Sequence, residues 1–92
     1  MRGSDKLADF AKEFNDAKNA LDNWTDVIEA ATWKNRAELK ATFGSASFVD
    51  GKTVFNIRGN KYRLICSINY ELETVLVTHI LTHKEYDKDK WK

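Results

Sequence analysis

Apolar residues recur at helical spacing in the first third of the chain, and this pattern predicts two amphipathic helices. Leu7, Phe10, Ala11 and Phe14 repeat at i, i+3, i+4 and i+7, with Ser4 as a candidate N-cap. Few residues separate this stripe from the next one, so together they predict an αα-hairpin. Stripes of this kind belong to a core far more often than to a partner-binding face. The second stripe comprises Ala20, Leu21, Trp24, Val27, Ile28 and Ala31.

In residues 54–68 apolar and polar positions alternate, which predicts two antiparallel strands. A glycine at the first position of a two-residue loop, as in Gly59-Asn60, is typical of a type II′ hairpin turn. This turn would pair Ile57 with Tyr62 and separate the side chains cleanly into two faces. Three cations on one small face would destabilise it, which suggests an anionic ligand. The apolar face would carry Phe55, Ile57, Tyr62 and Leu64, and the polar face Asn56, Arg58, Lys61 and Arg63.

A short helix and two more strands are predicted around this hairpin. Asn35, with Glu38 three residues later, resembles a capping box, and Gly44 would end the helix. The later strand is rich in β-branched residues, which favour extended structure. The strand candidates and the second turn signal are residues 45–49, Asp50-Gly51 and residues 75–82.

The order of these elements, helices first and strands afterwards, predicts an α+β fold. An N-terminal αα-hairpin and a short helix would pack on an antiparallel sheet of three or more strands, in a single domain spanning residues 1–92. Residues 1–4 resemble an expression-vector leader, and we set them apart as a candidate addition. At the other end, residues 83–87 would form a helical turn, and the charged residues 88–92 would fray.

Composition and charge exclude several classes of protein. The 92 residues are 42% hydrophobic and 32% charged, as in an ordinary soluble domain. No apolar run approaches the roughly 18 residues of a membrane span. The single cysteine, Cys66, cannot form an internal disulfide, which favours a buried thiol in a reduced, cytoplasmic protein. The net charge of +1 hides an excess of positive charge in residues 51–92, which suits a local phosphate site rather than strong DNA binding.

No cofactor or metal site is predicted. The chain holds no phosphate-cradling glycine loop, nucleotide fingerprint or nucleophile elbow, so we expect no cofactor. His79 and His83 are four residues apart, but His79 lies in a predicted strand and no third ligand is close in sequence. The pattern therefore does not favour a zinc site.

Two groups of residues remain as candidates for chemistry, the polar face of the hairpin and the group formed by His83, Tyr86 and Asp87. The last strand would return beside Arg63 and end at His83, which could bring both groups to one rim. Arginine and lysine bind phosphate, histidine transfers protons near neutrality, and tyrosine stacks on a base or donates a proton. Together they suit attack by a ribose 2′-hydroxyl on the adjacent phosphodiester, which requires RNA and no metal.

Taken singly, each of these residues also has a structural interpretation. Arg58 and Lys61 flank a turn, where solvated charges are the default, and Arg63 could pair with a carboxylate such as Glu38. His83 could bond the backbone in a loop. Tyr86 could cap the core, and Asp87 could end a helix.

Two strings, residues 54–65 (VFNIRGNKYRLI) and residues 82–87 (THKEYD), closely resemble the HigB toxin family of the RelE/ParE superfamily. The similarity covers roughly residues 7–88. The resemblance implies a compact α+β RNase that cleaves mRNA on the translating ribosome, as the toxin of a type II toxin–antitoxin module. It also implies a HigA-like helix-turn-helix antitoxin as partner. By position, it implicates Asn56, Lys61 and Arg63 in phosphate and RNA contacts, and His83 and Tyr86 in catalysis or base stacking. Together with the reading of the residues themselves, we expect catalytic roles for Arg63, His83, Tyr86 and Lys61, and RNA contacts by Asn56, Arg58, Asn60 and Asp87.

Two departures from the family pattern leave alternatives open. Family members usually carry an arginine where this chain has Thr78, and the N-terminal short strand of the family is replaced by Gly3 and Ser4. Loss of an RNA-contacting arginine would weaken cleavage. One alternative is therefore a non-catalytic module of the same fold that binds RNA or an antitoxin. A second alternative is a ParE-like inhibitor of DNA gyrase.

Overall fold

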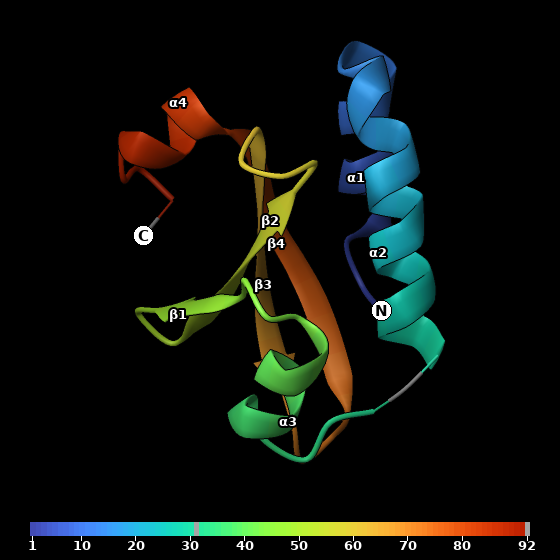
Figure 1. The fold of residues 1–92 in the computed structure, drawn as a ribbon, viewed down its shortest axis with the longest axis vertical. Coiled ribbons are helices and arrows are strands. Elements are labelled where there is room, and N and C mark those ends of the chain that lie inside the picture. Colours follow the sequence, from blue (N-terminus) through green and yellow to red (C-terminus); the bar gives the residue numbers. More distant parts are fainter. Residues whose placement is uncertain (31, 92) are drawn as a thin grey trace.

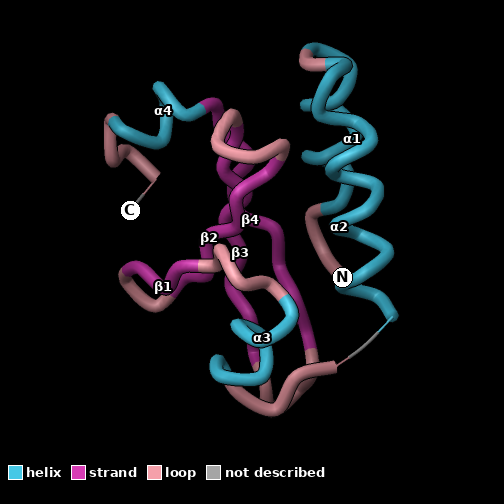
Figure 2. Tube along the Cα trace, in the orientation of Figure 1, coloured by secondary structure: helices cyan, strands magenta, loops and turns pink. Residues whose placement is uncertain are grey.

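A computed structural model describes residues 1–30 and 32–91 (Figures 1 and 2). Two long helices stand beside one face of an antiparallel sheet, and two short helices lie near its opposite ends. This arrangement confirms the predicted α+β class. Ala31, in the predicted second stripe, and Lys92 lie outside the described residues. The elements are α1 (Ser4–Glu13), the 3-10 turn η1 (Asn15–Ala17), α2 (Lys18–Ala30), α3 (Arg36–Thr42), β1 (Ser47–Val49), β2 (Lys52–Ile57), β3 (Tyr62–Asn69), β4 (Thr74–Thr82) and α4 (His83–Asp87).

The apolar stripes of α1 and α2 cover one face of the sheet, as predicted. Phe10 of α1 meets the Tyr62 ring edge-on at 5.2 Å between ring centroids, and Trp24 of α2 meets Phe55 at 5.3 Å. Because the side chains on this face are buried in the core, a shift of one residue would expose them, and the core therefore fixes the register of the hairpin. The buried members of this core include Leu7, Phe10, Leu21, Trp24, Ile28, Phe55, Ile57, Tyr62 and Leu64.

The sheet order is β1-β2-β3-β4, with every neighbouring pair antiparallel. Ile57 pairs with Tyr62, and Asn56 with Arg63, as the hairpin pattern predicted. The turn itself differs from the prediction. Arg58 has a φ of 52° and Gly59 a φ of 64°, so the strands end at Ile57 and Tyr62 and four residues form the loop. Arg58 and Lys61 therefore lie in the loop, and their side chains are not part of the polar face of the sheet.

The N-terminus of α1 corrects one capping prediction. The N-cap is Gly3, at a φ of 83°, and Ser4 is the first helical residue. Arg2 makes a short parallel bridge to β4, donating its N–H to the Val75 carbonyl at 2.8 Å. The backbone passes so close that a Cβ at Gly3 would lie 2.5 Å from the Val77 carbonyl oxygen. A glycine is required at this crossing, whereas a side-chain cap is not.

The predicted cap of α3 and the predicted turn at Asp50-Gly51 are both present. The Asn35 side chain accepts a hydrogen bond from the N–H of Glu38 at 3.0 Å and caps α3, while the Glu38 carboxylate accepts from the N–H of Lys34. Asp50 and Gly51, with φ values of 51° and 77°, join β1 to β2 in the left-handed conformation that tight hairpin turns use.

The second face of the sheet carries a small core of its own, built around Trp91. This side chain is 4% exposed and packs with Val54 and Ile65. Lys52 anchors the segment by donating from Nζ to the Trp91 carbonyl at 3.2 Å. Residues 88–92 were expected to fray, and for Trp91 this expectation is wrong, because an aromatic ring within the charged run finds an apolar surface on the open side of the sheet.

Candidate active site

Arg63 is the buried centre of the candidate site. It lies on the face of the sheet opposite α1 and α2, across from Asn56 in β2 and Leu81 in β4. The residue is only 8% exposed. Its Nη1 donates to the carbonyl oxygens of Asn60 and Tyr62 at 3.1 and 3.2 Å, and its Nη2 donates to Asn60 Oδ1. The guanidinium is therefore held by the hairpin itself, and not by a carboxylate such as Glu38.

Tyr86 lies over this guanidinium, with its ring centroid 5.5 Å from the Arg63 Cζ. The same ring stacks on Trp91 at 5.0 Å with 13° between the planes, and Trp91 Nε1 donates to the Tyr86 carbonyl at 3.0 Å. Tyr86 thus has two packing partners of its own. The arrangement fixes the ring and the guanidinium relative to each other, as a preorganised cationic site needs.

His83 and Asp87 form the outer part of the rim. His83 Nδ1 lies 2.9 Å from Asp87 Oδ2, and both side chains are solvent-accessible. The N–H of His83 donates to the Lys61 carbonyl at 3.1 Å, which joins α4 to the hairpin turn. At the start of α4, Thr82 and Glu85 form a complete capping box that the sequence reading missed. Asp87 lies against Nδ1, so Nε2 is the ring nitrogen of His83 that stays outside this pair.

Lys61 and Arg58 do not share the face of Arg63, which corrects the predicted cluster of three cations. Both contact Asp16, in the 3-10 turn between α1 and α2. Lys61 Nζ binds Asp16 Oδ2, and Arg58 Nε lies 3.5 Å from the same oxygen. The Tyr62 hydroxyl donates to Asp16 Oδ1 at 2.6 Å. These hydrogen bonds, first that of Lys61 and then that of Tyr62, lower the pKa of Asp16, and the Asp16 hydrogen bond raises the pKa of Lys61. Lys61 is therefore a charged group in an ion pair rather than a proton donor.

The predicted residues thus divide into two sets. Asn56, Asn60, Arg63, His83, Tyr86 and Asp87 lie along the open face and its rim, whereas Arg58 and Lys61 are tied to the helical layer. Sequence reasoning missed Trp91 and Asp16. A tryptophan in a charged run was a usable signal for the first, but no local pattern indicated the second.

Thr78 occupies a bulge in β4. The register shifts between Ile65 and Cys66, so that Ile65 pairs with His79 and Cys66 with Val77. Thr78 Oγ1 donates to the Ile65 carbonyl at 3.0 Å and serves the backbone of the neighbouring strand. Burial lowers the pKa of His79, as do the nearby charges of Lys52 and Lys6, which favours a neutral ring beside this bulge.

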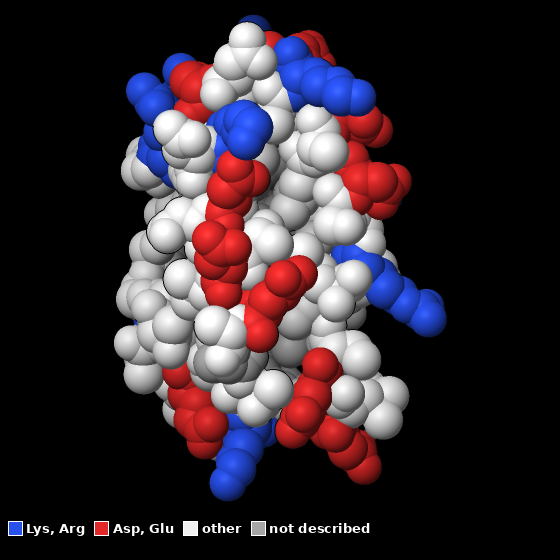
Figure 3. All heavy atoms as spheres, turned by 90° about the vertical axis from the view of Figure 1, so that its right-hand side faces the viewer, with Lys and Arg blue, Asp and Glu red and all other residues white. Residues whose placement is uncertain are grey.

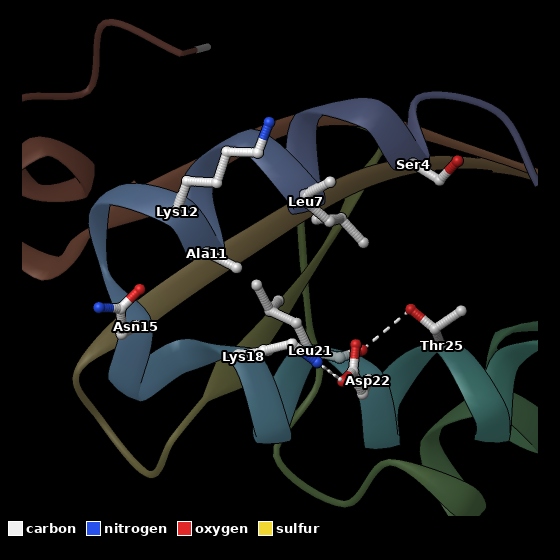
Figure 4. A pocket seen from close by; sticks show the side chains of 10 residues that line it. Ser4, Leu7, Ala11, Lys12, Asn15, Lys18, Leu21, Asp22 and Thr25 are labelled. Carbon is white, nitrogen blue, oxygen red and sulfur yellow. Dashed lines mark hydrogen bonds and ion pairs between the residues drawn. The ribbon is translucent and has the colours of Figure 1, made fainter.

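The helical side of the molecule has a different character. Figure 3 shows acidic side chains along the middle of this face, with lysine and arginine mostly toward its ends. A hollow of about 580 Å³ lies between α1 and α2, and Leu7, Ala11 and Leu21 point into it (Figure 4). This hollow is larger than those near Arg63. Its lining includes Lys12 and Lys18, but Lys18 is paired with Asp22 at 2.8 Å, and the acidic surface around it repels nucleic acid. The exposed acidic residues of the two helices are Asp5, Asp9, Glu13, Asp22, Asp26 and Glu29.

Within the described residues, no helix is long and apolar enough to cross a membrane. The same residues hold no group of three or more histidine, cysteine, aspartate or glutamate side chains placed to bind a metal ion.

A four-stranded antiparallel sheet with an α-helical hairpin on one face, and a buried arginine against a tyrosine ring on the other, is consistent with the RelE-like fold. A model of the HigB_toxin family, described as the RelE-like toxic component of a toxin-antitoxin system, matches residues 17–89, and the chain belongs to this family. It is similar to the mRNA interferase toxin HigB of Escherichia coli (strain K12), with 31% identity over 84 residues that cover 88% of this chain and 81% of that protein. The mRNA interferase HigB proteins of Escherichia coli O157:H7 and Shigella flexneri match with the same identity and coverage.

Proposed function

We propose that this toxin is an endoribonuclease that cleaves mRNA on the translating ribosome. The observation that carries the proposal is the close pair of His83 and Asp87, 2.9 Å apart, placed on the same rim as a buried arginine. The names of its HigB relatives, which are mRNA interferases, support the same substrate. A HigA-like helix-turn-helix antitoxin is the proposed partner, since the family is the toxic component of a toxin-antitoxin system.

The proposed reaction is attack by a ribose 2′-hydroxyl on the adjacent phosphodiester. His83 acts as general base or acid, with Asp87 orienting its ring through Nδ1. Arg63 supplies positive charge to the pentacovalent phosphate, and Tyr86 stacks on a base or transfers a proton. The products are a 2′,3′-cyclic phosphate and a 5′-hydroxyl. Because the attacking group is the 2′-hydroxyl, DNA is not a substrate.

The two cations tied to Asp16 have a different proposed role. Lys61 and Arg58 keep exposed side chains, 56% and 54% accessible, while they pair with this carboxylate. Their charge attracts the RNA backbone at the end of the hairpin without contacting the reacting phosphate. Asn56 and Asn60 contribute hydrogen bonds to the RNA along the open face.

The matched pair of histidines provides the test. Wild type, His83→Gln and the control His79→Gln are expressed separately, and new mRNA 5′ ends are mapped during translation. We expect new ends with wild type and His79→Gln, and loss of at least 100-fold in cleavage with His83→Gln, in line with the roughly 10²–10⁴-fold contribution of general acid–base catalysis. If His83→Gln cuts as well as wild type, the catalytic assignment is wrong. If wild type yields no new ends, the nuclease proposal is wrong.

A non-catalytic module remains the second candidate, and Thr78 is the observation that favours it. Its hydroxyl is used by the neighbouring strand, where the family usually supplies an arginine. Such a module would retain mRNA or antitoxin in a pull-down but produce no new 5′ ends. If Thr78→Arg produces new mRNA 5′ ends, the protein is an enzyme weakened at this position. If it produces none, the protein is a binding module.

A further inference from the structure

A small hollow of about 210 Å³ opens beside the free part of strand β2, where β1 no longer pairs with it. α2 contributes Asn23 and Trp24 to its lining, and the β2 side contributes Asn56 and Arg58. Phe43 and Ile57 form apolar walls. We call this hollow the edge pocket. It is smaller than the roughly 300–1,000 Å³ of pockets for drug-sized ligands, so it suits a small, flat group.

Trp24, which lines the edge pocket, carries an unsatisfied buried donor. The residue is 3% exposed, and its indole Nε1–H has no hydrogen-bond partner among the described residues. Phe55 meets the indole ring at 5.3 Å, and Phe43 meets Phe55 at 4.9 Å, so packing restricts the ring. Buried donors in folded proteins are nearly always paired. A hydrogen-bond acceptor on a bound ligand would satisfy the Trp24 donor.

The polar side chains around the pocket suit a nucleobase and its phosphate. Asn23 and Asn56 are exposed, and each carboxamide offers both a donor and an acceptor. Arg58, held by its Nη1 bond to the Asp16 carbonyl at 3.2 Å, keeps an exposed cationic head at the same place. Proteins read single-stranded RNA by hydrogen bonds to the edges of unstacked bases and by contacts to apolar or aromatic walls.

The position of the edge pocket connects it to the candidate active site. Asn56 lines the pocket and pairs directly with Arg63 in the β2–β3 ladder. Adjacent strands lie about 4.7–4.9 Å apart. One strand width therefore separates the pocket from the buried arginine, which places it within reach of a neighbouring nucleotide.

We propose that the edge pocket binds one unpaired nucleobase of the RNA, next to the linkage that is cut. The Trp24 indole donates to an acceptor atom of the base, the carboxamides of Asn23 and Asn56 bond its edge, and Arg58 contacts its phosphate. The pocket thereby contributes to sequence preference. This inference rests on the proposed function, because it assumes that RNA crosses the open face.

Nuclear magnetic resonance of ¹⁵N-labelled protein tests the pocket without using cleavage as the readout. AMP, GMP, CMP and UMP are titrated separately while the indole Nε1–H and carboxamide signals are followed. At least one nucleotide is expected to shift the Trp24 indole signal in a saturable way, together with the carboxamide signals of Asn23 and Asn56. Trp24→Phe, which keeps an aromatic ring but removes the donor, should weaken that binding about 2- to 12-fold, the range of one net hydrogen bond.

Trp33→Phe is the matched control. Its indole is also buried, but Nε1 already donates to Thr42 Oγ1 at 3.2 Å, and Trp33 does not line the edge pocket. This variant should bind the nucleotides as wild type does. The inference is overturned if no nucleotide shifts the Trp24 signal, in which case the donor bonds only water, or if Trp24→Phe binds with unchanged affinity.

The mRNA mapping described above separates this inference from the proposed function. Cleavage of mRNA by a protein whose Trp24 signal never responds would overturn the edge pocket alone. A saturable Trp24 response in a protein that cuts no mRNA would overturn the nuclease proposal and leave the pocket standing.

Discussion

Replacement of Trp91 by alanine should destabilise the whole domain, although this residue lies next to the end of the chain. Its side chain is 96% covered, with Val54 and Ile65 beneath it and Tyr86 stacked against it. Truncating a buried aromatic residue to alanine costs about 3–5 kcal/mol in a main core. Because this cluster is small and partly open, we expect the lower end, about 3 kcal/mol, which includes the lost hydrogen bond to the Tyr86 carbonyl.

A loss of this size is large for a chain of 92 residues. Domains of this length unfold with a free energy on the order of 5–14 kcal/mol, so about 3 kcal/mol is a substantial fraction of the total. Urea unfolding followed by far-ultraviolet circular dichroism measures it. With a slope of about 1–1.5 kcal/mol per molar urea, the midpoint should fall by about 2–3 M.

Trp91→Phe is the control for this substitution. It retains a ring against Tyr86 and the sheet but loses the Nε1 donor, so we expect a decrease of only about 1–2 kcal/mol. An unfolding midpoint for Trp91→Ala within experimental error of wild type would refute the reasoning, because it would mean that Trp91 does not pack on the sheet in solution.

Three further outcomes follow from the described contacts. Arg63→Lys loses the fork that bonds Asn60 and Tyr62, and should lower the free energy of unfolding by about 2 kcal/mol and abolish mRNA cleavage, measured by urea unfolding and 5′-end mapping. Gly3→Ala forces a side chain onto a φ of 83° against the Val77 carbonyl, so its melting temperature should fall, by the equivalent of about 1–3 kcal/mol. Burial raises the pKa of Cys66 from 9.0 to about 12. The folded state thus keeps the Cys66 thiol protonated to a higher pH than the unfolded state does. The free energy of unfolding should therefore be highest below pH 9 and fall by about 4 kcal/mol by pH 12. Cys66→Ala should lose this alkaline dependence, and an unchanged urea midpoint-versus-pH curve would contradict the assignment.

The sequence predicted the parts of the fold that depend on local pattern. The helical stripes of α1 and α2, the Asn35 cap and the Ile57–Tyr62 register each follow from the spacing of a few neighbouring residues. The prediction of the turn was wrong at Arg58, because its positive φ is unusual for its residue type and has no local signature in the sequence.

The candidate site was predictable only where strand pairing joins its parts. The return of the last strand beside Arg63 was expected to allow the hairpin and the group at residues 83–87 to share one rim, and Arg63 Cζ does lie 5.5 Å from the Tyr86 ring centroid. Asp16, by contrast, lies 45 residues before the lysine that it binds. No periodicity links two such positions, so only tertiary packing could show that Lys61 belongs to the helical layer.

The capping box and the Trp91 cluster have a consequence for the dynamics of α4. This helix has five residues, none of them buried, and it is fixed by Thr82, Glu85 and the stacked Trp91 rather than by the main core. Elements with so little buried surface open locally at a lower free energy than the strands they extend. Amide hydrogens of α4 should therefore exchange well before those of β3. The histidine and tyrosine of the rim would then belong to a separate opening unit, while the buried arginine stays with the last part of the protein to unfold.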